Sequence, residues 1–198
     1  WASTAFRTSL GLKLETLSLP PEMAAGRLSG GGTELMRVLA EYRHTTMWVQ
    51  ATRAHSVGRV RSGLFGKPDI AYTLDRRDME TFRKGLHLVA RTHFAAGARK
   101  VLPGIQGMPS SLTADQVDTL LDAPTDPRAY VGVLSHLFGG CVAGADPERS
   151  VTDQQGAVHG YQGLYVSDAS TIPTTLGVNP QHTIMALSRY KAEQLLQA

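Results

Sequence analysis

Apolar and polar residues alternate most clearly between positions 44 and 74 of the chain. Residues 45–52 are rich in β-branched and aromatic side chains, and residues 58–61 and 68–74 continue the alternation. Short connections that contain glycine separate the three segments. The pattern predicts three strands of an antiparallel sheet.

A long helix is predicted directly after these strands. Asp75 occupies the N-cap position, and Gly97 ends the helical pattern. Between them, apolar residues recur at steps of three and four: Met79, Phe82, Leu86, Val89, Ala90 and Phe94. Thr113 and Gln116 have the form of a capping box before a second, shorter helix. Residues 1–43 show little periodicity and predict an irregular lead-in that continues from a missing upstream segment.

The last third of the chain predicts two strands and a helix. Residues 130–134 form the first strand, which places His136 at its end, and residues 163–166 form a second, largely buried strand that ends at Asp168. Asn179 is the expected N-cap of the C-terminal helix, with Pro180 as its first residue. The inner face of this helix is expected to carry Ile184, Leu187, Tyr190, Lys191 and Leu195.

Composition limits the classes of protein to which the chain can belong. Its 198 residues are 42% hydrophobic, which is enough for one domain or two small lobes that share a core. Lys and Arg number 20 against 17 Asp and Glu, and the basic residues are dispersed without interleaved aromatic residues, so nucleic acid is excluded as a partner.

Other classes of site are excluded by residue spacing. The seven histidines show no metal-ligand spacing, so no metal site is expected, and the single cysteine, Cys141, excludes an intramolecular disulfide. No stretch reaches the roughly 18 consecutive apolar residues of a membrane span. We therefore expect a soluble protein, with the cytoplasm favoured as its compartment. The chain begins at Trp1 without an initiator methionine, so we expect it to be part of a longer polypeptide.

Three residues of the last third are candidates for chemistry. His136 precedes two glycines that permit close approach, and histidine is the side chain best suited to accept a hydroxyl proton near neutral pH. The carboxylate of Asp168 and the next backbone N–H group suit a ribityl or pyrophosphate group. The helix that begins at Asn179 directs a positive end toward a ligand, as the pyrimidine edge of a flavin requires. Each residue also has a structural interpretation: a core histidine, a turn-forming aspartate and a helix cap.

In their order and spacing, these segments resemble the C-terminal signature of the glucose–methanol–choline (GMC) family of flavoprotein oxidoreductases. The interval between His136 and Asn179, 179 − 136 = 43 positions, is similar to that of the family's catalytic pair. The middle of the chain is similar in layout to the family's substrate-binding domain. The segments that carry the resemblance are 136–141, 146–147, 158–160, 163–170, Pro173 and 179–186.

The resemblance implies a function and a fold. The function is hydride transfer from an alcohol carbon to flavin N5, with FAD as the cofactor and a small-molecule alcohol as the substrate. The fold is α+β (α/β), in which residues 44–135 form a substrate-binding domain and residues 136–198 contribute a strand and a helix to an FAD-binding domain located elsewhere. The catalytic residues are His136 and Asn179. The cofactor-binding residues are Asp168, Ala169, Asn179, Pro180, Gln181 and Thr183, and His182 is expected behind them or in the core.

One part of the family pattern is absent. The Gly-x-Gly-x-x-Gly fingerprint between a strand and a helix does not occur, because the glycines at 30–32 follow no β-rich segment and those at 139, 140 and 144 are wrongly spaced. We therefore expect the FAD-binding portion on the same or another chain. A hydroxynitrile lyase of the same family and a non-catalytic binding module remain alternatives. A substrate pocket is one interpretation of Met47, Trp48, Phe65, Tyr72 and Met108, and packing in a sheet core is the other.

Overall fold

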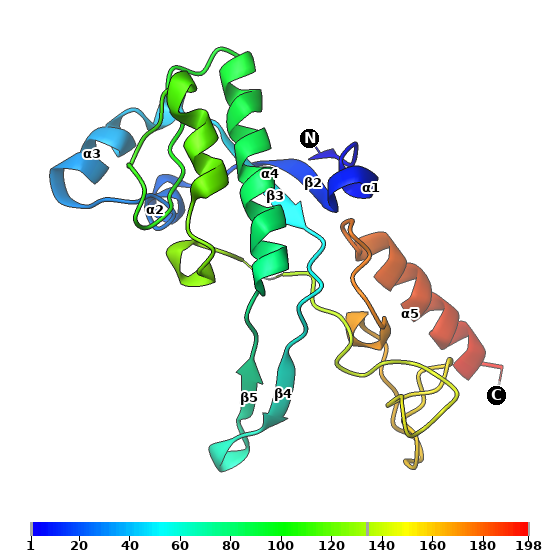
Figure 1. Cartoon of the computed structure of the whole chain (residues 1–198). Coiled ribbons are helices and arrows are strands. Elements are labelled where there is room, and N and C mark those ends of the chain that lie inside the picture. The colour runs from blue at the N-terminus through cyan, green and yellow to red at the C-terminus, as the bar shows by residue number, and fades with distance from the viewer. Residues whose placement is uncertain (1, 134, 198) are drawn as a thin grey trace. The chain divides into compact units, whose positions relative to one another are not determined.

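The computed structural model describes residues 2–133 and 135–197 and divides into two compact units (Figure 1). The first unit comprises Trp1–Arg59 and Ile70–Val133, and the second comprises Val60–Asp69 and Leu134–Ala198. Helices and small antiparallel sheets occur together, which confirms the predicted α+β class. Within the described residues, no helix combines the length and the apolar character needed to cross a membrane.

The first unit is built on a three-stranded sheet in which β1 (Ala2–Ser3), β2 (Leu12–Leu17) and β3 (Met47–Thr52) pair antiparallel in that order. Every residue of β2 is paired with a residue of β3. Leu12 and Leu14 of β2 are buried. The first 43 residues thus contain more regular structure than their weak periodicity predicts, because β2 depends on a partner strand that is distant in sequence.

The predicted long helix is confirmed as α4 (Arg76–Ala95), which packs against β3. Asp75 caps it, since its carboxylate accepts a 2.8 Å hydrogen bond from the amide of Asp78. Val89 packs with Leu12 and Leu14 into one small core. The polar and apolar pattern of this segment therefore identified both the helix and its buried face.

A second core lies on the other side of α4, where η3 (Ala114–Asp122) packs. The predicted capping box of Thr113 and Gln116 is present at its start. Ala90 of α4 is buried there with four apolar residues of η3 and of the segments that flank it: Ile105, Leu112, Leu120 and Ala123. The short helices of the unit are α1 (Arg7–Leu10), α2 (Pro21–Ala25), α3 (Gly32–Ala40), η1 (Tyr42–His44) and η4 (Pro127–Ala129).

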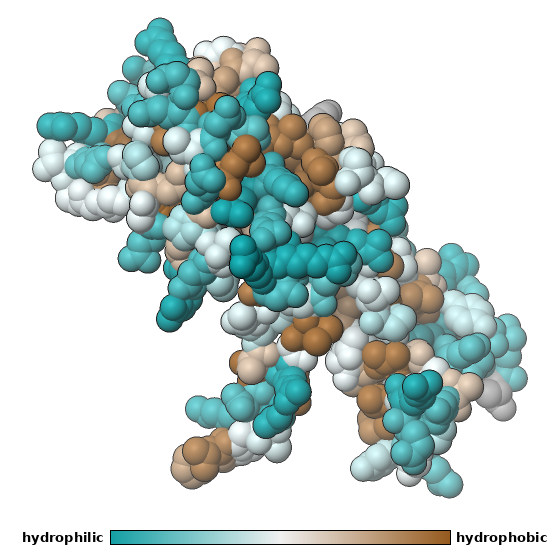
Figure 2. Space-filling model, viewed as in Figure 1, coloured by the Kyte–Doolittle hydropathy of each residue, from teal (hydrophilic) through white to brown (hydrophobic). Residues whose placement is uncertain are grey.

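The expectation of a single sheet from the three central strands is wrong. β4 (Arg59–Ser62) and β5 (Pro68–Ala71) form a hairpin of their own, and β3 pairs with β2 instead. The connection after β3 is held by α4, because the carboxylate of Asp78 accepts hydrogen bonds from the amides of His55 and Ser56. The chain therefore leaves the sheet before β4 begins. The tip of the hairpin, η2 (Leu64–Gly66), is apolar and exposed (Figure 2).

The second unit consists mostly of loops, followed by η5 (Ala169–Thr171) and α5 (Gln181–Leu195). Isolated bridges join its loops, and Thr152 takes part in two of them, one with Ala143 and one with Val158. Thr152 is fully buried, so these bridges surround the centre of the unit.

Neither strand predicted for the last third is present. Tyr130–Val133 is irregular, and Leu134 lies outside the described residues. In the segment 163–166, only Tyr165 forms a bridge, with Ala157, and Leu164 and Tyr165 are 49% and 44% exposed rather than buried. Apolar character favoured strands here, but a strand also requires a neighbouring strand for its backbone, and the described residues supply none.

Candidate active site

His136 lies in an irregular, exposed segment of the second unit. Its side chain forms no hydrogen bond or ion pair with any other described residue, so the imidazole is available to a ligand. The chain that follows is firmly anchored. The amide of Cys141 donates to the carbonyl of Ser170 over 2.9 Å, and the amide of Ala143 donates to the carbonyl of Thr171 over 3.1 Å. The segment that carries His136 is thereby bonded to the turn that carries Asp168.

Asp168 caps the short helix η5. Its carboxylate accepts hydrogen bonds from the amide and the hydroxyl of Ser170, at 2.8 and 2.5 Å. These bonds lower the pKa of Asp168, and the charge of Lys191 acts in the same direction. The structural interpretation of Asp168 as a turn-forming residue is therefore confirmed, while a contact with a cofactor stays a prediction.

The C-terminal helix begins one residue later than predicted. α5 starts at Gln181, Pro180 occupies the N-cap position, and the carbonyl of Pro180 accepts from the amide of Ile184 over 2.9 Å. The prediction that Asn179 is the N-cap is thus wrong. Asn179 is exposed just before the helix, whereas Pro180 is buried. Because proline has no N–H group and holds its φ near helical values, it serves as well at this boundary as inside the helix.

The first turn of α5 is open to a ligand. Gln181, His182 and Thr183 are all exposed, and the turn carries no acidic residue. His182 therefore does not lie in the core, where one interpretation placed it. The first N–H groups of a helix lack partners within the helix and carry partial positive charge. This end of α5 suits an anionic or electron-rich group.

The inner face of α5 differs from the predicted one. Leu187, Tyr190 and Leu195 are 37%, 47% and 42% exposed, whereas Lys191 is only 4% exposed. Ser188, which the apolar pattern could not identify, also belongs to the inner face, because its hydroxyl donates to the carbonyl of Ser167 over 2.8 Å. Helical periodicity correctly placed Lys191 on the face of α5 that contacts the rest of the second unit. On that face, however, the polar side chains of Lys191 and Ser188 make the contacts.

Lys191 donates two hydrogen bonds to the segment that contains Asp168. Its ammonium group contacts the carbonyl of Val166 at 3.1 Å and the hydroxyl of Thr171 at 2.9 Å. Burial lowers the pKa of Lys191, while the carboxylates of Asp168 and Asp153 oppose that shift. The segment of His136, the turn of Asp168 and the helix that follows Asn179 are therefore connected through a single set of bonds within the second unit.

The residues proposed for a substrate pocket belong to different parts of the fold, and Trp48 and Met108 pack in different cores of the first unit. Phe65 is 96% exposed at the tip of the hairpin, Trp48 packs edge to face against His93, and Met108 packs against the second core. Two of the five therefore pack against other side chains, as the packing interpretation expected. A hollow of about 410 Å³ beside Met108 is lined entirely by residues of the first unit, from Gly107 to Pro124.

Comparison with known proteins places the chain in a class of oxidoreductases. Residues 54–188 match the family described as GMC oxidoreductase. An uncharacterized GMC-type oxidoreductase of Mycobacterium tuberculosis is 33% identical over 189 residues, which cover 96% of this chain. The chain belongs to the GMC oxidoreductase family, as the resemblance of its last third implied.

Two further relatives extend the comparison. A second GMC-type oxidoreductase, y4nJ of Sinorhizobium fredii, is 38% identical over 73% of this chain and 29% of its own length. Long-chain-alcohol oxidase FAO1 of Arabidopsis thaliana is 27% identical over 90% of this chain and 25% of its own length. The chain spans about 30% of the length of the mycobacterial relative.

Proposed function

We propose that this chain is the substrate-binding and catalytic C-terminal portion of an FAD-dependent alcohol oxidoreductase. The observation that carries the proposal is the imidazole of His136, which is exposed and has no bonding partner among the described residues. It lies on a segment bonded to the Asp168 turn, and that turn is bonded to α5. A relative named long-chain-alcohol oxidase supports an alcohol as the substrate class.

In this proposal His136 is the general base. Its imidazole accepts the proton of the substrate hydroxyl, and the amide side chain of Asn179 hydrogen-bonds to the same oxygen. Loss of that proton raises the electron density on the oxygen, which favours removal of the hydrogen from the adjacent carbon. Among the described residues no protein group bonds to His136, so each ring nitrogen can serve the substrate as acceptor or donor.

The residues present fit a flavin. The exposed first turn of α5 carries no carboxylate that would repel the electron-rich pyrimidine edge of the ring. The side chains of Gln181 and Thr183, the exposed Asn179 and the turn at Asp168 and Ala169 would hold the cofactor. Pro180 would contribute by fixing the start of α5, since its side chain is buried and its carbonyl accepts from the amide of Ile184. When bound, FAD supplies the acceptor for the two electrons that the alcohol loses.

The FAD-binding portion would come from elsewhere in the polypeptide or from another chain. The chain carries no dinucleotide-binding fingerprint. Its relatives are more than three times as long as the part that it matches, which leaves room for such a portion.

Anaerobic mixing of the full-length protein with primary alcohols tests the proposal. We expect the purified protein to be yellow and its flavin to bleach after alcohol is added. A yellow protein that stays oxidised while it cleaves cyanohydrins would identify a hydroxynitrile lyase instead. A colourless protein that does not take up added FAD would identify a non-catalytic module.

A further inference from the structure

Lys191 is the most unusual residue of the second unit. A lysine side chain is almost never fully buried, because its ammonium group loses its hydration, yet this one is 4% exposed. An apolar side chain of similar length would fill the same volume at a lower cost. The cost of burial indicates that the polar end of Lys191 has a function that packing alone would not require.

Three segments enclose the ammonium group. It donates to the carbonyl of Val166 and to the hydroxyl of Thr171. Gly156, which has φ +90°, lies against it: a Cβ atom at that position would be 3.3 Å from Nζ of Lys191 and 2.6 Å from the carbonyl oxygen of Val166. The amide of Val166 donates to the carbonyl of Gly156 over 2.8 Å. The absence of a side chain at position 156 therefore creates the space that Lys191 occupies.

The contacts continue from Lys191 to Asp168. The hydroxyl of Thr171, which accepts from Lys191, donates its own hydrogen to the carbonyl of Asp168 over 3.0 Å. The carbonyl of Thr171 accepts from the amide of Ala143, in the segment that follows His136. Lys191 is thus bonded to the residue that follows the Asp168 turn, and through it to the anchored end of the His136 segment. Ser188 of the same helix bonds only to the residue before the turn, through the carbonyl of Ser167.

We propose that Lys191 is a positioning residue that fixes the turn of residues 168–170 relative to the first turn of α5. This inference rests on the proposed function, in which those two features form the flavin-contacting surface of this chain. Lys191 acts through Thr171 and touches neither substrate nor cofactor. Its loss leaves the ligand-contacting side chains in place but releases the backbone that orients them.

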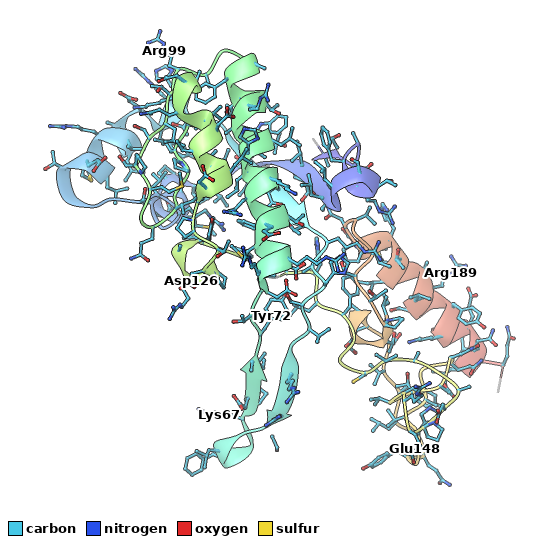
Figure 3. All side chains as sticks on the ribbon, in the orientation of Figure 1. Lys67, Tyr72, Arg99, Asp126, Glu148 and Arg189 are labelled. Carbon is cyan, nitrogen blue, oxygen red and sulfur yellow. The ribbon has the colours of Figure 1, made fainter. Side chains whose placement is uncertain are left out.

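The experiment compares Lys191→Met with Arg189→Gln in the full-length protein. Methionine keeps the length of the side chain and removes its hydrogen bonds and charge. Arg189 is on the same helix (Figure 3), but its side chain is exposed and, among the residues that the structure describes, is paired with Glu193 one turn further along α5. Arg189→Gln therefore removes one positive charge without touching the turn.

The first measurement is the affinity of the apoprotein for FAD. We expect Lys191→Met to weaken it by about 10- to 100-fold, the range for loss of hydrogen bonds from a charged donor, and Arg189→Gln to leave it within about twofold. Equal affinity of the wild type and Lys191→Met would overturn the inference. Failure of the wild type itself to bind FAD would overturn the proposed function, so the two failures are distinguishable.

The second measurement is amide hydrogen exchange without flavin. Lys191→Met should accelerate exchange at Cys141 and Ala143, whose amides bond to the turn, and leave Gly144, which bonds to Thr152, unchanged. Uniform acceleration across the unit would mean that Lys191 only stabilises the fold and would overturn the inference.

If Lys191→Met does not fold, Thr171→Val removes the same connection at its other end and should accelerate the same two amides. Normal exchange in Thr171→Val would also overturn the inference.

Discussion

The amide of Cys141 donates a 2.9 Å hydrogen bond to the carbonyl of Ser170. This bond joins the segment that follows His136 to the turn capped by Asp168, although the two residues are 29 positions apart (170 − 141). The order of the motifs in the sequence implies one site. This hydrogen bond shows that the segments of the His136 and Asp168 motifs are neighbours within the second unit.

Asp78→Asn is expected to destabilise the first unit by about 3 kcal/mol. The carboxylate of Asp78 is 1% exposed and accepts from two backbone amides and from the hydroxyl of Ser56. The side-chain amide of asparagine replaces one of the two acceptor oxygens with an NH2 group, which is a donor and would face the donors of His55 and Ser56. Urea denaturation would measure the loss. The matched control is Asp122→Asn, an exposed position of η3 in the first unit, which should change stability by less than about 0.5 kcal/mol.

The same carboxylate should make stability depend on pH in the acid range. Burial raises the pKa of Asp78, but the bonds from Ser56 and His55 outweigh that effect, and the pKa is lowered overall. A lowered pKa in the folded state contributes stability that is present above the pKa of the unfolded chain and is lost as pH falls through the folded pKa. We therefore expect a smaller decline below about pH 4 in Asp78→Asn than in the wild type. Parallel declines in the two proteins would contradict this account.

Gly156→Ala should destabilise the second unit by about 3 kcal/mol or more. The new Cβ atom would meet the carbonyl oxygen of Val166 at 2.6 Å, and φ is +90°. Gly160 also has positive φ, at +78°, but has open space around its Cβ position. Gly160→Ala should therefore cost only the backbone strain, about 1 to 2 kcal/mol. Thermal denaturation of both variants tests the difference, and equal losses would show that the contact with Val166 does not matter.

Phe65→Gly should not reduce stability, although it removes a large apolar side chain. Phe65 is 96% exposed and has φ +59°, a left-handed conformation that glycine adopts without strain. Leu64 is also exposed at 82%, but it does not have positive φ, so Leu64→Gly should cost about 0.5 to 1 kcal/mol. Melting temperatures of the two variants should therefore move in different directions. A clear fall in the melting temperature of Phe65→Gly would mean that the phenyl ring makes a stabilising contact and would contradict this prediction.

Local patterns predicted the elements that are stabilised locally. Asp75 and the apolar positions of α4 were sufficient to identify that helix, and Thr113 with Gln116 identified the start of η3. β2 has little periodicity of its own because it is stabilised by β3. The apolar run before Asp168 predicts a strand, but the described residues supply no partner strand for it. Long-range pairing cannot be read from the polarity of a single segment.

The candidate site was predictable only as a set of motifs. Sequence order brought His136, Asp168 and Asn179 to attention, but each residue alone has a structural explanation. Lys191 was placed on the inner face of its helix by periodicity, and its hydrogen bonds to Val166 and Thr171 could not be anticipated. The role of a buried charge follows from its hydrogen-bond partners, and the partners of Lys191 lie 20 and 25 positions before it in the sequence.

The most direct measurement is the rate of flavin reduction by alcohol, in the absence of oxygen, in the full-length protein with His136→Ala. We expect the rate to fall by a factor on the order of 10² or more, because the general base is lost. His44→Gln, a change at an exposed histidine of the first unit, is the control and should reduce flavin at the wild-type rate. A near-normal rate in His136→Ala would contradict the assignment of His136 as the base.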